Sequence, residues 1–493
     1  MAKDTAIYGV SSIFGRFLNY LLVPLYTQTL SAASGGYGII TNVYAWTALI
    51  LVILTFGMET TFFRFANKSS EKPQVVYSTT LITVAILSIA FVALVLGFLP
   101  VISQAMGYEQ HPQYIAVMAI VVALDAIQAI PFAYLRYKRK AIKFATLKLL
   151  FIGLNILLNL IYFVVLPALY KSHPDVIGKI YDPSVGAGYA FYLNLVCTGI
   201  ITLFFRKELF GIKYEFSKSL LKRMLRYSWP ILVLGVAGIL NQTADKILFP
   251  FIYHAADQKA QLGIYGAAAK IAMIMALITQ AFRYAYEPFV FGKSEDKNNK
   301  ETYAKAMNYF IIFTLLAFLA VMAWMEFLKY IIAPDYWDGL QVVPIVMAAE
   351  IMMGIYFNLS FWYKLIDRTV WGAWFSGAGC LVLILVNVVF VPRYGYMACA
   401  WAGVAGYGTA MLLSYFVGQR KYPIAYPLKS IAAYVLIAAL FTAIMLVLPK
   451  DWPVWLRLTA NTGLILLFVG HIVYHDFPLH QLPVVGRYFR KRN

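Results

Sequence analysis

Charged residues are scarce in this chain: Asp, Glu, Lys and Arg make up only 13% of its 493 residues. Apolar residues make up 61%, and the mean hydropathy is +0.71. That balance excludes an ordinary soluble globular protein. Apolar runs of about 20 residues recur along the chain, and each is long enough to cross a hydrocarbon core of ~30 Å. The runs are continuous rather than alternating, which excludes a membrane β-barrel and predicts an all-α polytopic membrane protein.

Cysteine is also nearly missing, and the three residues present, Cys197, Cys380 and Cys399, fall within apolar runs. None belongs to a CxxC pair or has a histidine partner in its motif, so the sequence predicts neither a disulfide framework nor a metal site. We interpret all three as packing residues. No Walker-type phosphate loop is found, which argues against direct use of ATP, and no cofactor is expected.

Fourteen apolar runs have the length of membrane-spanning helices. Their ranges are 6–30, 37–62, 76–100, 114–135, 146–168, 185–205, 228–253, 262–290, 306–332, 341–362, 370–391, 395–418, 428–448 and 453–474. With the N-terminus in the cytoplasm, strict alternation puts most of the 41 Lys and Arg on the cytoplasmic side, which is the positive-inside pattern. The net charge of +19 therefore reflects topology, with contact to anionic lipid headgroups, and not binding of nucleic acid. Both termini are expected in the cytoplasm.

No segment between the runs is long enough to fold as a catalytic domain. The longest, 206–227, contains "FSKSLLKRMLRYSWP", in which Ser217 can cap an interfacial helix with one apolar and one basic face. The longest predicted outer segment is 170–185. The expected organisation is an N-terminal lobe of six helices (1–206), a cytoplasmic interfacial linker (207–227), a C-terminal lobe of six helices (228–420), helices 13 and 14 (421–475) and a basic cytoplasmic tail (476–493).

An internal repeat relates the two halves. The segment 35–63 aligns with 263–291 at a constant offset of 228 residues, and Tyr37, Gly38 and Glu59 each meet an identical residue. Upstream, "NYLLVPLY" (19–26) resembles "DKILFPFI" (245–252). The repeated helices run in the same direction, so the lobes are expected to be pseudo-symmetric about an axis along the membrane normal. Repeats of this kind favour a transporter whose substrate binds in a central cavity between the lobes.

Several polar residues interrupt the apolar runs. An ionisable residue at mid-membrane costs ~2.5–3.5 kcal/mol on insertion scales and usually faces a cavity or a partner. Near the middle of the first run, Arg16 shares a helical face with Asn19 and Tyr20. Further candidates are Glu59, Asp125, Asn241, Asp245, Lys246, Lys270, Arg283 and Glu287.

The adjacent charges Asp245 and Lys246 raise two alternatives, a structural ion pair or the lining of a wet cavity. Neighbouring side chains on a helix point about 100° apart, so we expect each of the two to pair elsewhere or to face water. Glu59 lies near a predicted cytoplasmic end, where a long side chain reaches water easily, so a structural role stays open there. Arg16 has no acidic residue within a helical turn, which favours a functional role.

If these polar faces converge, the cations outnumber the acids and the cavity carries positive charge. The cations in question are Arg16, Lys246, Lys270 and Arg283. Such a cavity selects an anionic ligand, and the planar fork of Arg fits phosphate oxygens. Asn19, Tyr20, Tyr44 and Asn241 supply polar or aromatic groups for sugars. Asp125, Asp245, Glu59 and Glu287 are the candidates for coupling transport to H⁺ or Na⁺.

The motifs "TADKIL", "LGIYGAAAKIA" and "AFRYAYEPFVF", with "WYKLIDRT" and "VPRYGYMACAWA" further on, resemble those of the bacterial polysaccharide and lipid-linked oligosaccharide flippases. That family belongs to the multidrug/oligosaccharidyl-lipid/polysaccharide flippase superfamily. The resemblance covers nearly the whole chain. It implies 14 transmembrane helices, with two pseudo-symmetric six-helix lobes around a central cavity, plus helices 13–14, which in lipid II flippases help form a groove for the lipid tail.

The resemblance further implies a flippase in the bacterial cytoplasmic (inner) membrane, working in lipopolysaccharide or O-antigen synthesis. It would move an undecaprenyl-diphosphate-linked oligosaccharide from the inner to the outer leaflet, with cavity arginines such as Arg16 on the diphosphate. Glycan polymerase machinery is a possible partner. The alternatives left open are an ion-coupled multidrug exporter, a lipid II flippase, and a membrane enzyme such as a glycan polymerase or ligase.

Overall fold

The computed structural model describes residues 20–68, 71–292, 299–366, 368–449 and 451–476. Every regular element in these ranges is helical, which confirms the predicted all-α class. Twelve helices there are long and apolar enough to cross a membrane, and Gly188–Phe204 is a shorter apolar helix. The chain is therefore a multi-pass integral membrane protein. Most of the first predicted span, 6–30, lies outside the described residues, so the count of 14 is not confirmed.

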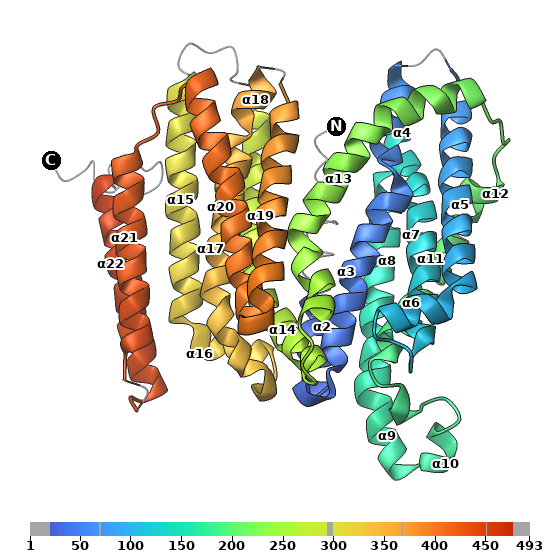
Figure 1. Cartoon of the computed structure of the whole chain (residues 1–493), viewed down its shortest axis with the longest axis horizontal. Helices are drawn as coiled ribbons and strands as arrows, with labels where there is room; N and C mark the ends of the chain where they lie inside the picture. Colours follow the sequence, from blue (N-terminus) through green and yellow to red (C-terminus); the bar gives the residue numbers. More distant parts are fainter. Residues whose placement is uncertain (1–19, 69–70, 293–298, 367, 450, 477–493) are drawn as a thin grey trace. The chain divides into compact units, whose positions relative to one another are not determined.

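The chain divides into two compact units, of which the first comprises residues 1–267 and 380–402. Its helices are α2 (Leu22–Thr29), η1 (Ala32–Ser34), α3 (Gly36–Thr55), α4 (Met58–Lys68), α5 (Pro73–Gly97), α6 (Leu99–Ala105), α7 (Pro112–Tyr137), α8 (Ala141–Leu160), η2 (Ile161–Val165), α9 (Leu166–Ser172), α10 (Pro174–Ile177), η3 (Pro183–Val185), α11 (Gly188–Phe204), α12 (Arg206–Phe210) and α13 (Lys218–Ile252) (Figure 1).

The second unit comprises residues 268–379 and 403–493. Three helices continue from one unit into the other: α14 (Gln258–Gly292), α19 (Val370–Tyr394) and α20 (Tyr396–Lys421). The helices within the second unit are α15 (Asn299–Ala323), α16 (Met325–Leu328), η4 (Lys329–Ile331), η5 (Pro334–Val342), α17 (Val343–Leu359), α18 (Phe361–Leu365), α21 (Leu428–Val447) and α22 (Val454–His475). The predicted boundaries of the two lobes remain a prediction.

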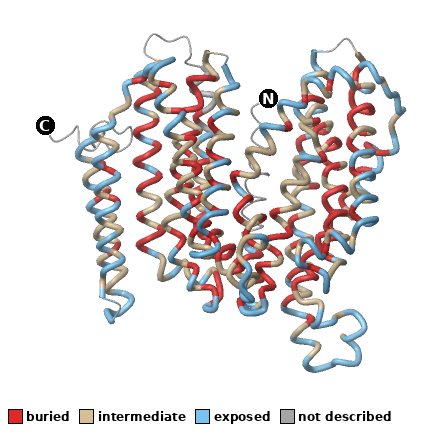
Figure 2. The backbone as a smooth tube through the Cα atoms, in the orientation of Figure 1, coloured by how far each residue is buried: buried red, intermediate tan, exposed pale blue. Residues whose placement is uncertain are grey.

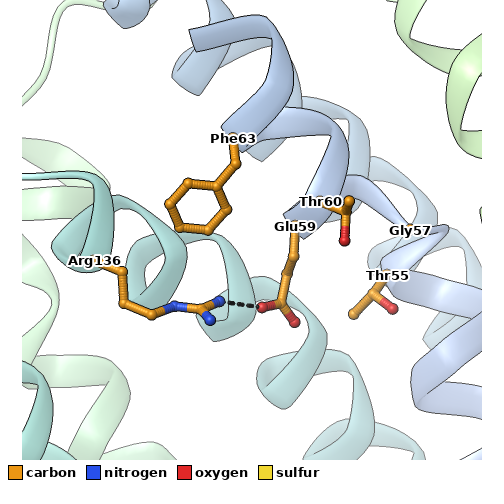
Figure 3. A pocket seen from close by; sticks show the side chains of 6 residues that line it. All are labelled: Thr55, Gly57, Glu59, Thr60, Phe63 and Arg136. Atoms are coloured by element: carbon orange, nitrogen blue, oxygen red, sulfur yellow. Dashed lines mark hydrogen bonds and ion pairs between the residues drawn. The ribbon is translucent and has the colours of Figure 1, made fainter. Parts of the chain in front are cut away.

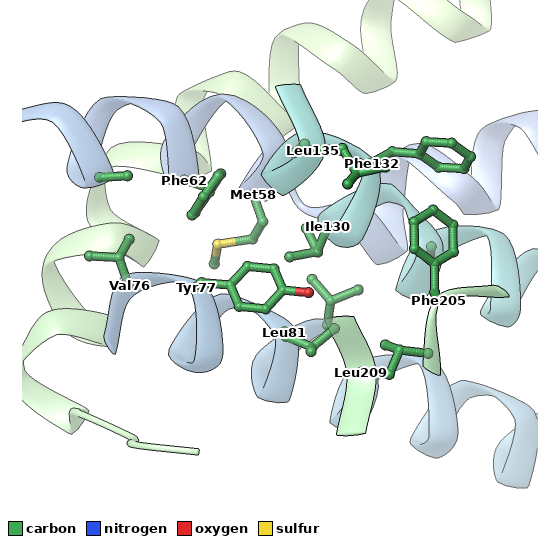
Figure 4. Packing of buried hydrophobic residues seen from close by; sticks show 14 of the residues in the cluster. Met58, Phe62, Val76, Tyr77, Leu81, Ile130, Phe132, Leu135, Phe205 and Leu209 are labelled. Atoms are coloured by element: carbon green, nitrogen blue, oxygen red, sulfur yellow. The ribbon is translucent and has the colours of Figure 1, made fainter. Parts of the chain in front are cut away.

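A large apolar core holds the first unit together. Met58, Phe62, Tyr77 and Phe205 are among its members and are 0–1% exposed (Figure 4). The Tyr77 hydroxyl donates to the Glu208 carbonyl at 2.9 Å, so even the polar tip of this ring is satisfied. Buried residues follow the inward faces of the helices while exposed ones face outward (Figure 2). This core binds α4, α5, α7 and α12 into one body.

The predicted linker (207–227) and the span that follows it are not separate elements, because helix α13 begins inside the linker and continues through the span. Its N-cap is Ser217, as expected, since the Ser217 side chain accepts the Leu220 N–H. Leu220 and Met224 form the buried apolar face. However, the helix runs for 35 residues to Ile252 without a break, so the amphipathic turns and the following span form a single helix.

The predicted span 37–62 is interrupted. Helix α3 ends at Thr55, Phe56 and Gly57 take left-handed backbone angles (φ +50° and +66°), and α4 begins at Met58. A Cβ on Gly57 would lie 2.9 Å from the Ile231 side chain, so α13 passes directly against the break. Gly57 therefore meets two demands that other residues meet poorly, a positive φ and a close contact.

The two copies of the repeat pack against each other through matching glycines. A Cβ on Gly38 would lie 1.9 Å from the Lys259 carbonyl oxygen, and one on Gly266 would lie 2.5 Å from Thr41 Oγ1. Gly38 and Gly266 are equivalent in the repeat. Small residues let helix backbones approach closely in a membrane, and here the same position does so in both copies.

The α21–α22 hairpin is fastened to the second unit by polar contacts near its two ends. Asp476 accepts hydrogen bonds from Asn308 Nδ2 at 2.9 Å and from the Tyr434 hydroxyl. At the other end of α22, near its start, Arg457 Nη1 donates to the Glu326 carboxylate of α16 at 2.8 Å. Because polar groups gain little from lipid tails, these contacts hold the hairpin against α15 and α16 more specifically than apolar packing could.

Candidate functional site

Asp245 and Lys246 form an ion pair in α13, with 2.9 Å between Lys246 Nζ and Asp245 Oδ2. Only 10% of the Asp245 side chain and 23% of the Lys246 side chain are exposed. The prediction that the two side chains diverge is wrong. The Cα–Cβ bonds do point apart, but the four-carbon stem of Lys246 is flexible enough to fold back to its neighbour and to the Gln242 carbonyl.

Asp245 also receives a hydrogen bond from a second helix. The Tyr265 hydroxyl of α14 donates to Asp245 Oδ2 at 2.5 Å, and Lys246 Nζ lies 5.4 Å from the centre of the Tyr265 ring. The buried thiol of Cys399 lies near enough to the Asp245 carboxylate for the two groups to interact electrostatically. The carboxylate is thus held by an ammonium and a phenol, two charge-assisted contacts that fix its position.

The turn of α13 that carries the pair is tied to α3. Asn42 Nδ2 donates to the Lys246 carbonyl at 2.7 Å, and the Tyr108 hydroxyl donates to Asn42 Oδ1 at 2.9 Å. Tyr108 lies in the α6–α7 connection, where burial raises the pKa of its hydroxyl above the usual range and keeps it a proton donor. The ion pair, Tyr265, Asn42 and Tyr108 together form what we call the α13 polar cluster.

A second polar chain crosses the first unit and joins two of the predicted residues. Asn194 Nδ2 donates to the Tyr44 hydroxyl at 2.9 Å. The Thr198 hydroxyl, Oγ1, lies 3.3 Å from Asn194 Oδ1 and 3.4 Å from Asp125 Oδ1. The opposite charge of Lys148 acts on Asp125. Tyr44 and Asp125 are therefore two ends of one hydrogen-bonded path.

Glu59 lines a cavity of about 270 Å³ beside the break between α3 and α4. Its carboxylate accepts a hydrogen bond from Arg136 Nη2 of α7 at 2.7 Å, while Thr55 and Thr60 line the opposite side (Figure 3). The two charged side chains are 41% and 35% exposed. Glu59 therefore has a partner and also remains open to a cavity, so both the structural role and the coupling role stay predictions.

The remaining predicted residues are only partly placed. Arg16 and Asn19 lie outside the described residues, as does the side chain of Glu287. Tyr20 opens the described part, and its hydroxyl is buried without a partner among the described residues. Asn241 lies one turn before Asp245 and donates to the Ala237 carbonyl.

Lys270 and Arg283 belong to the second unit, whereas Lys246 belongs to the first. Lys270 is half-buried, and the Arg283 guanidinium lies 5.0 Å from the Phe357 ring centre. The convergence of the four cations therefore stays a prediction.

Tyr265, Asn42, Tyr108 and Arg136 were not singled out from the sequence. The repeat offered a signal for two of them: Tyr265 matches Tyr37, and Asn42 occupies the position that matches Lys270. Tyr108 and Arg136 come from segments outside the repeat, and their contacts depend on how α7 packs. Sequence spacing alone carries no information about those contacts.

A family model described as "Polysaccharide biosynthesis protein" matches residues 1–285, more than half of the chain. The chain belongs to this family. Among curated proteins, none matches it. The matched range 1–285 therefore includes the α13 polar cluster, the Tyr44–Asp125 path and the residues of the Glu59 cavity.

Comparison with solved structures shows which fold this chain has. A structure of the lipid II flippase MurJ in an inward closed conformation has a TM-score of 0.71 and 14% identity, and the match covers 95% of this chain and 99% of that one. An inward-facing multidrug resistance MATE family transporter of the MOP superfamily has a TM-score of 0.62 and 16% identity, covering 87% and 96%. The predicted superfamily fold is confirmed, since both proteins share it over almost their whole length.

Proposed function

We propose that this protein is a flippase that moves an undecaprenyl-diphosphate-linked oligosaccharide, an O-antigen or other polysaccharide repeat unit, from the inner to the outer leaflet. The observation that carries the proposal is membership of the polysaccharide biosynthesis family combined with a fold shared by a lipid II flippase and a multidrug resistance MATE transporter. A multi-span protein with this fold supplies a route across the membrane for a polar headgroup, while the lipid tail stays in the bilayer.

The diphosphate would be held by Arg16, Lys246, Lys270 and Arg283. The α13 polar cluster suggests how binding is coupled to an ion. Lys246 is neutralised by Asp245 in the present state, so a phosphate must compete with that carboxylate for the ammonium. A proton or Na⁺ on Asp245 would release Lys246 to the phosphate. Asp245 is thus the leading coupling residue, with Asp125, Glu59 and Glu287 behind it.

Alternating access requires a contact that can open and close on the outer side. The matched glycines support this step, because Gly38 lets the Lys259 backbone of α14 approach α3, and Gly266 lets the Thr41 side chain of α3 approach α14. We infer that this contact is the outer gate, and that its separation releases the headgroup. Tyr44, Tyr20, Asn19 and Asn241 would meet the sugars along the way.

Headgroup transfer in proteoliposomes tests the proposal. Arg16→Ala and Lys246→Ala proteins should fold but flip the lipid-linked oligosaccharide at least about tenfold more slowly. Lys305→Ala, which removes a lysine that is 64% exposed, is the matched control and should flip at the wild-type rate. Wild-type rates in both cavity variants would remove the cationic site from the mechanism.

A small-molecule exporter driven by an ion gradient is the second candidate, favoured by the likeness to MATE transporters. Its signature would be efflux of organic cations that depends on the ion gradient, with normal surface glycan after deletion of the gene. The flippase predicts the reverse, in which a lipid-linked glycan accumulates on the inner leaflet.

A further inference from the structure

The helices α8, η2 and α9 form one continuous helical segment, and its C-terminal end carries a group of tyrosines that the proposed mechanism does not use. The continuous helical segment Ala141–Ser172 has 32 residues. At 1.5 Å per residue it is about 48 Å long, well beyond a hydrocarbon core of ~30 Å. In Figure 1, α9 and α10 project past the ends of α6 and α7. Residues 170–185 form the longest predicted outer segment.

Four tyrosines meet at this end of the first unit. Tyr181 and Tyr189 stack with ring centres 5.4 Å apart and planes inclined by 13°. The Tyr170 ring packs edge-on to Tyr181 at 5.8 Å, and the Tyr162 ring lies 5.0 Å from Tyr189. Tyr162 comes from η2, a π-helical turn, a distortion often found at functional sites. Tyr170 and Tyr181 are half-exposed, so they present ring surface to the outside.

The loop that carries Tyr181 is held in one conformation. The Tyr189 hydroxyl accepts the Asp182 N–H at 2.7 Å, and the Tyr114 hydroxyl donates to the Val185 carbonyl at 3.1 Å. A Cβ on Gly188 would lie 2.5 Å from the Tyr114 ring, so the loop is pressed against α7. A pinned loop keeps the exposed rings in place before a ligand arrives, which lowers the entropy lost on binding.

Hydrogen-bond acceptors accompany the rings. Asp182 is exposed, and the N–H of Ser184 lowers the pKa of its carboxyl, so it stays ionised. Pro112, two residues before Tyr114, lines a cavity of about 260 Å³ together with the exposed side chains of Gln104 and Glu109. The same face thus combines flat aromatic surfaces with carboxylate and amide groups.

We propose that these tyrosines form a saccharide-binding platform on the outer face. A sugar ring has an apolar C–H face that packs on an aromatic ring and hydroxyl edges that donate to carboxylates. The platform fits this chemistry with Tyr170 and Tyr181 as the stacking surfaces and Asp182 as the acceptor. The inference rests on the proposed function, because a flipped headgroup would emerge on this side. The platform would hold the glycan as it leaves the cavity.

An interfacial aromatic belt is the competing explanation, since Tyr is common where a membrane meets water. Belt residues bind lipid headgroups singly, whereas these rings contact one another in a row and are joined to a hydrogen-bonded loop. The two explanations predict different ligands and can be separated by experiment.

The test uses the full-length protein in lipid nanodiscs. The probe is the lipid-free glycan released by mild acid from the lipid-linked intermediates of the source strain. Its binding is measured by saturation-transfer NMR. The double variant Tyr170→Ala/Tyr181→Ala should raise Kd at least about tenfold, and Tyr181→Phe, which keeps the ring, less than about twofold. Tyr330→Ala is the matched control, since Tyr330 is a 63% exposed tyrosine of the second unit.

Wild-type affinity in the double variant, or no saturable binding by the wild-type protein, would overturn the platform. So would a double variant that keeps wild-type glycan affinity and loses only thermal stability in phosphatidylethanolamine–phosphatidylglycerol vesicles, because the rings would then be a lipid belt. Flipping of the lipid-linked glycan is measured separately. If the wild-type protein binds the free glycan but flips nothing, the flippase proposal fails and the platform stands.

Discussion

The two copies of the repeat have similar sequences but different helices. In the first copy the span breaks at Phe56 and Gly57, and α4 begins a new helix at Met58. In the second copy α14 continues without interruption through the equivalent positions, 284 and 285. Position 57 is Gly and its counterpart is Ala285. Left-handed geometry is easy for Gly and costly for Ala, so the glycine permits the break in the first copy and Ala285 disfavours one in the second.

Because of the break, the glutamate that the two copies share lies at different places in its helix. Glu59 lies in the first turn of α4, where a carboxylate is favoured by the helix dipole, and it faces a cavity and Arg136. Its counterpart Glu287 lies well inside α14. The repeat therefore keeps the glutamate but places it in the first turn of a helix in one copy and inside a continuous helix in the other. At the other end of the repeat, Gly38 and Gly266 kept the same role in both copies.

The largest effect is expected from Gly38→Val. Its Cβ would meet the Lys259 carbonyl oxygen, and a backbone atom yields less easily than a side chain, so we expect a loss of at least about 3 kcal/mol in SDS-induced unfolding. Gly266→Val should cost less, because it meets the Thr41 side chain. Gly153→Val is the control, since nothing lies within 4 Å of its Cβ. Equal stability of all three variants would disprove close packing of the copies.

Gly57→Ala should cost about 2 kcal/mol, because the new methyl group adds the strain of a positive φ to a 2.9 Å contact with Ile231. Gly107→Ala separates the two causes, since Gly107 has φ +73° but open space around it. Thermal unfolding in detergent measures both. A Gly57→Ala protein more stable than wild type would mean that the break straightens at no cost, and that the copies differ for another reason.

Ala285→Gly makes the second copy resemble the first and should cost about 0.5–1 kcal/mol through helix propensity. We expect α14 to stay continuous, because a glycine permits a break without imposing one. Hydrogen exchange of the amides around residue 285 is the measurement. Rapid exchange confined to that turn would show that glycine is sufficient to break the helix.

Glu59→Gln should have the smallest effect on stability, below about 1 kcal/mol, because both partners of the Glu59–Arg136 pair are more than one-third exposed. A double-mutant cycle with Arg136→Gln isolates the interaction. A coupling energy above about 2 kcal/mol would show that the pair behaves as a buried one, and would make Glu59 a structural residue.

The fold was largely predictable, because continuous apolar runs and the distribution of Lys and Arg reflect the bilayer directly. The repeat located Gly38 and Gly266, which proved to be contact residues. The break at Phe56–Gly57 was not predicted. A glycine in an apolar run is compatible with a continuous helix, and only its packing against Ile231 distinguishes the two outcomes.

The site was less predictable, since ionisable residues are easy to find in apolar sequence but their partners are not. Helical geometry suggested that Asp245 and Lys246 diverge, and it failed because it treats a long side chain as a fixed vector. The Tyr44–Asp125 path passes through Asn194 and Thr198 of α11, which no spacing rule connects to either end. Contacts between distant helices depend on packing angles that a single sequence does not encode locally.

The fastening of α21 and α22 to α15 has a consequence for how the protein is made. Asn308 and Glu326 leave the ribosome long before Asp476 and Arg457, the residues that engage them. Until translation reaches those residues, Asn308 of α15 lacks the Asp476 carboxylate, and Glu326 of α16 has Lys329 but not Arg457 as a partner. The polar contacts of the second unit are therefore complete only after α22 has been synthesised.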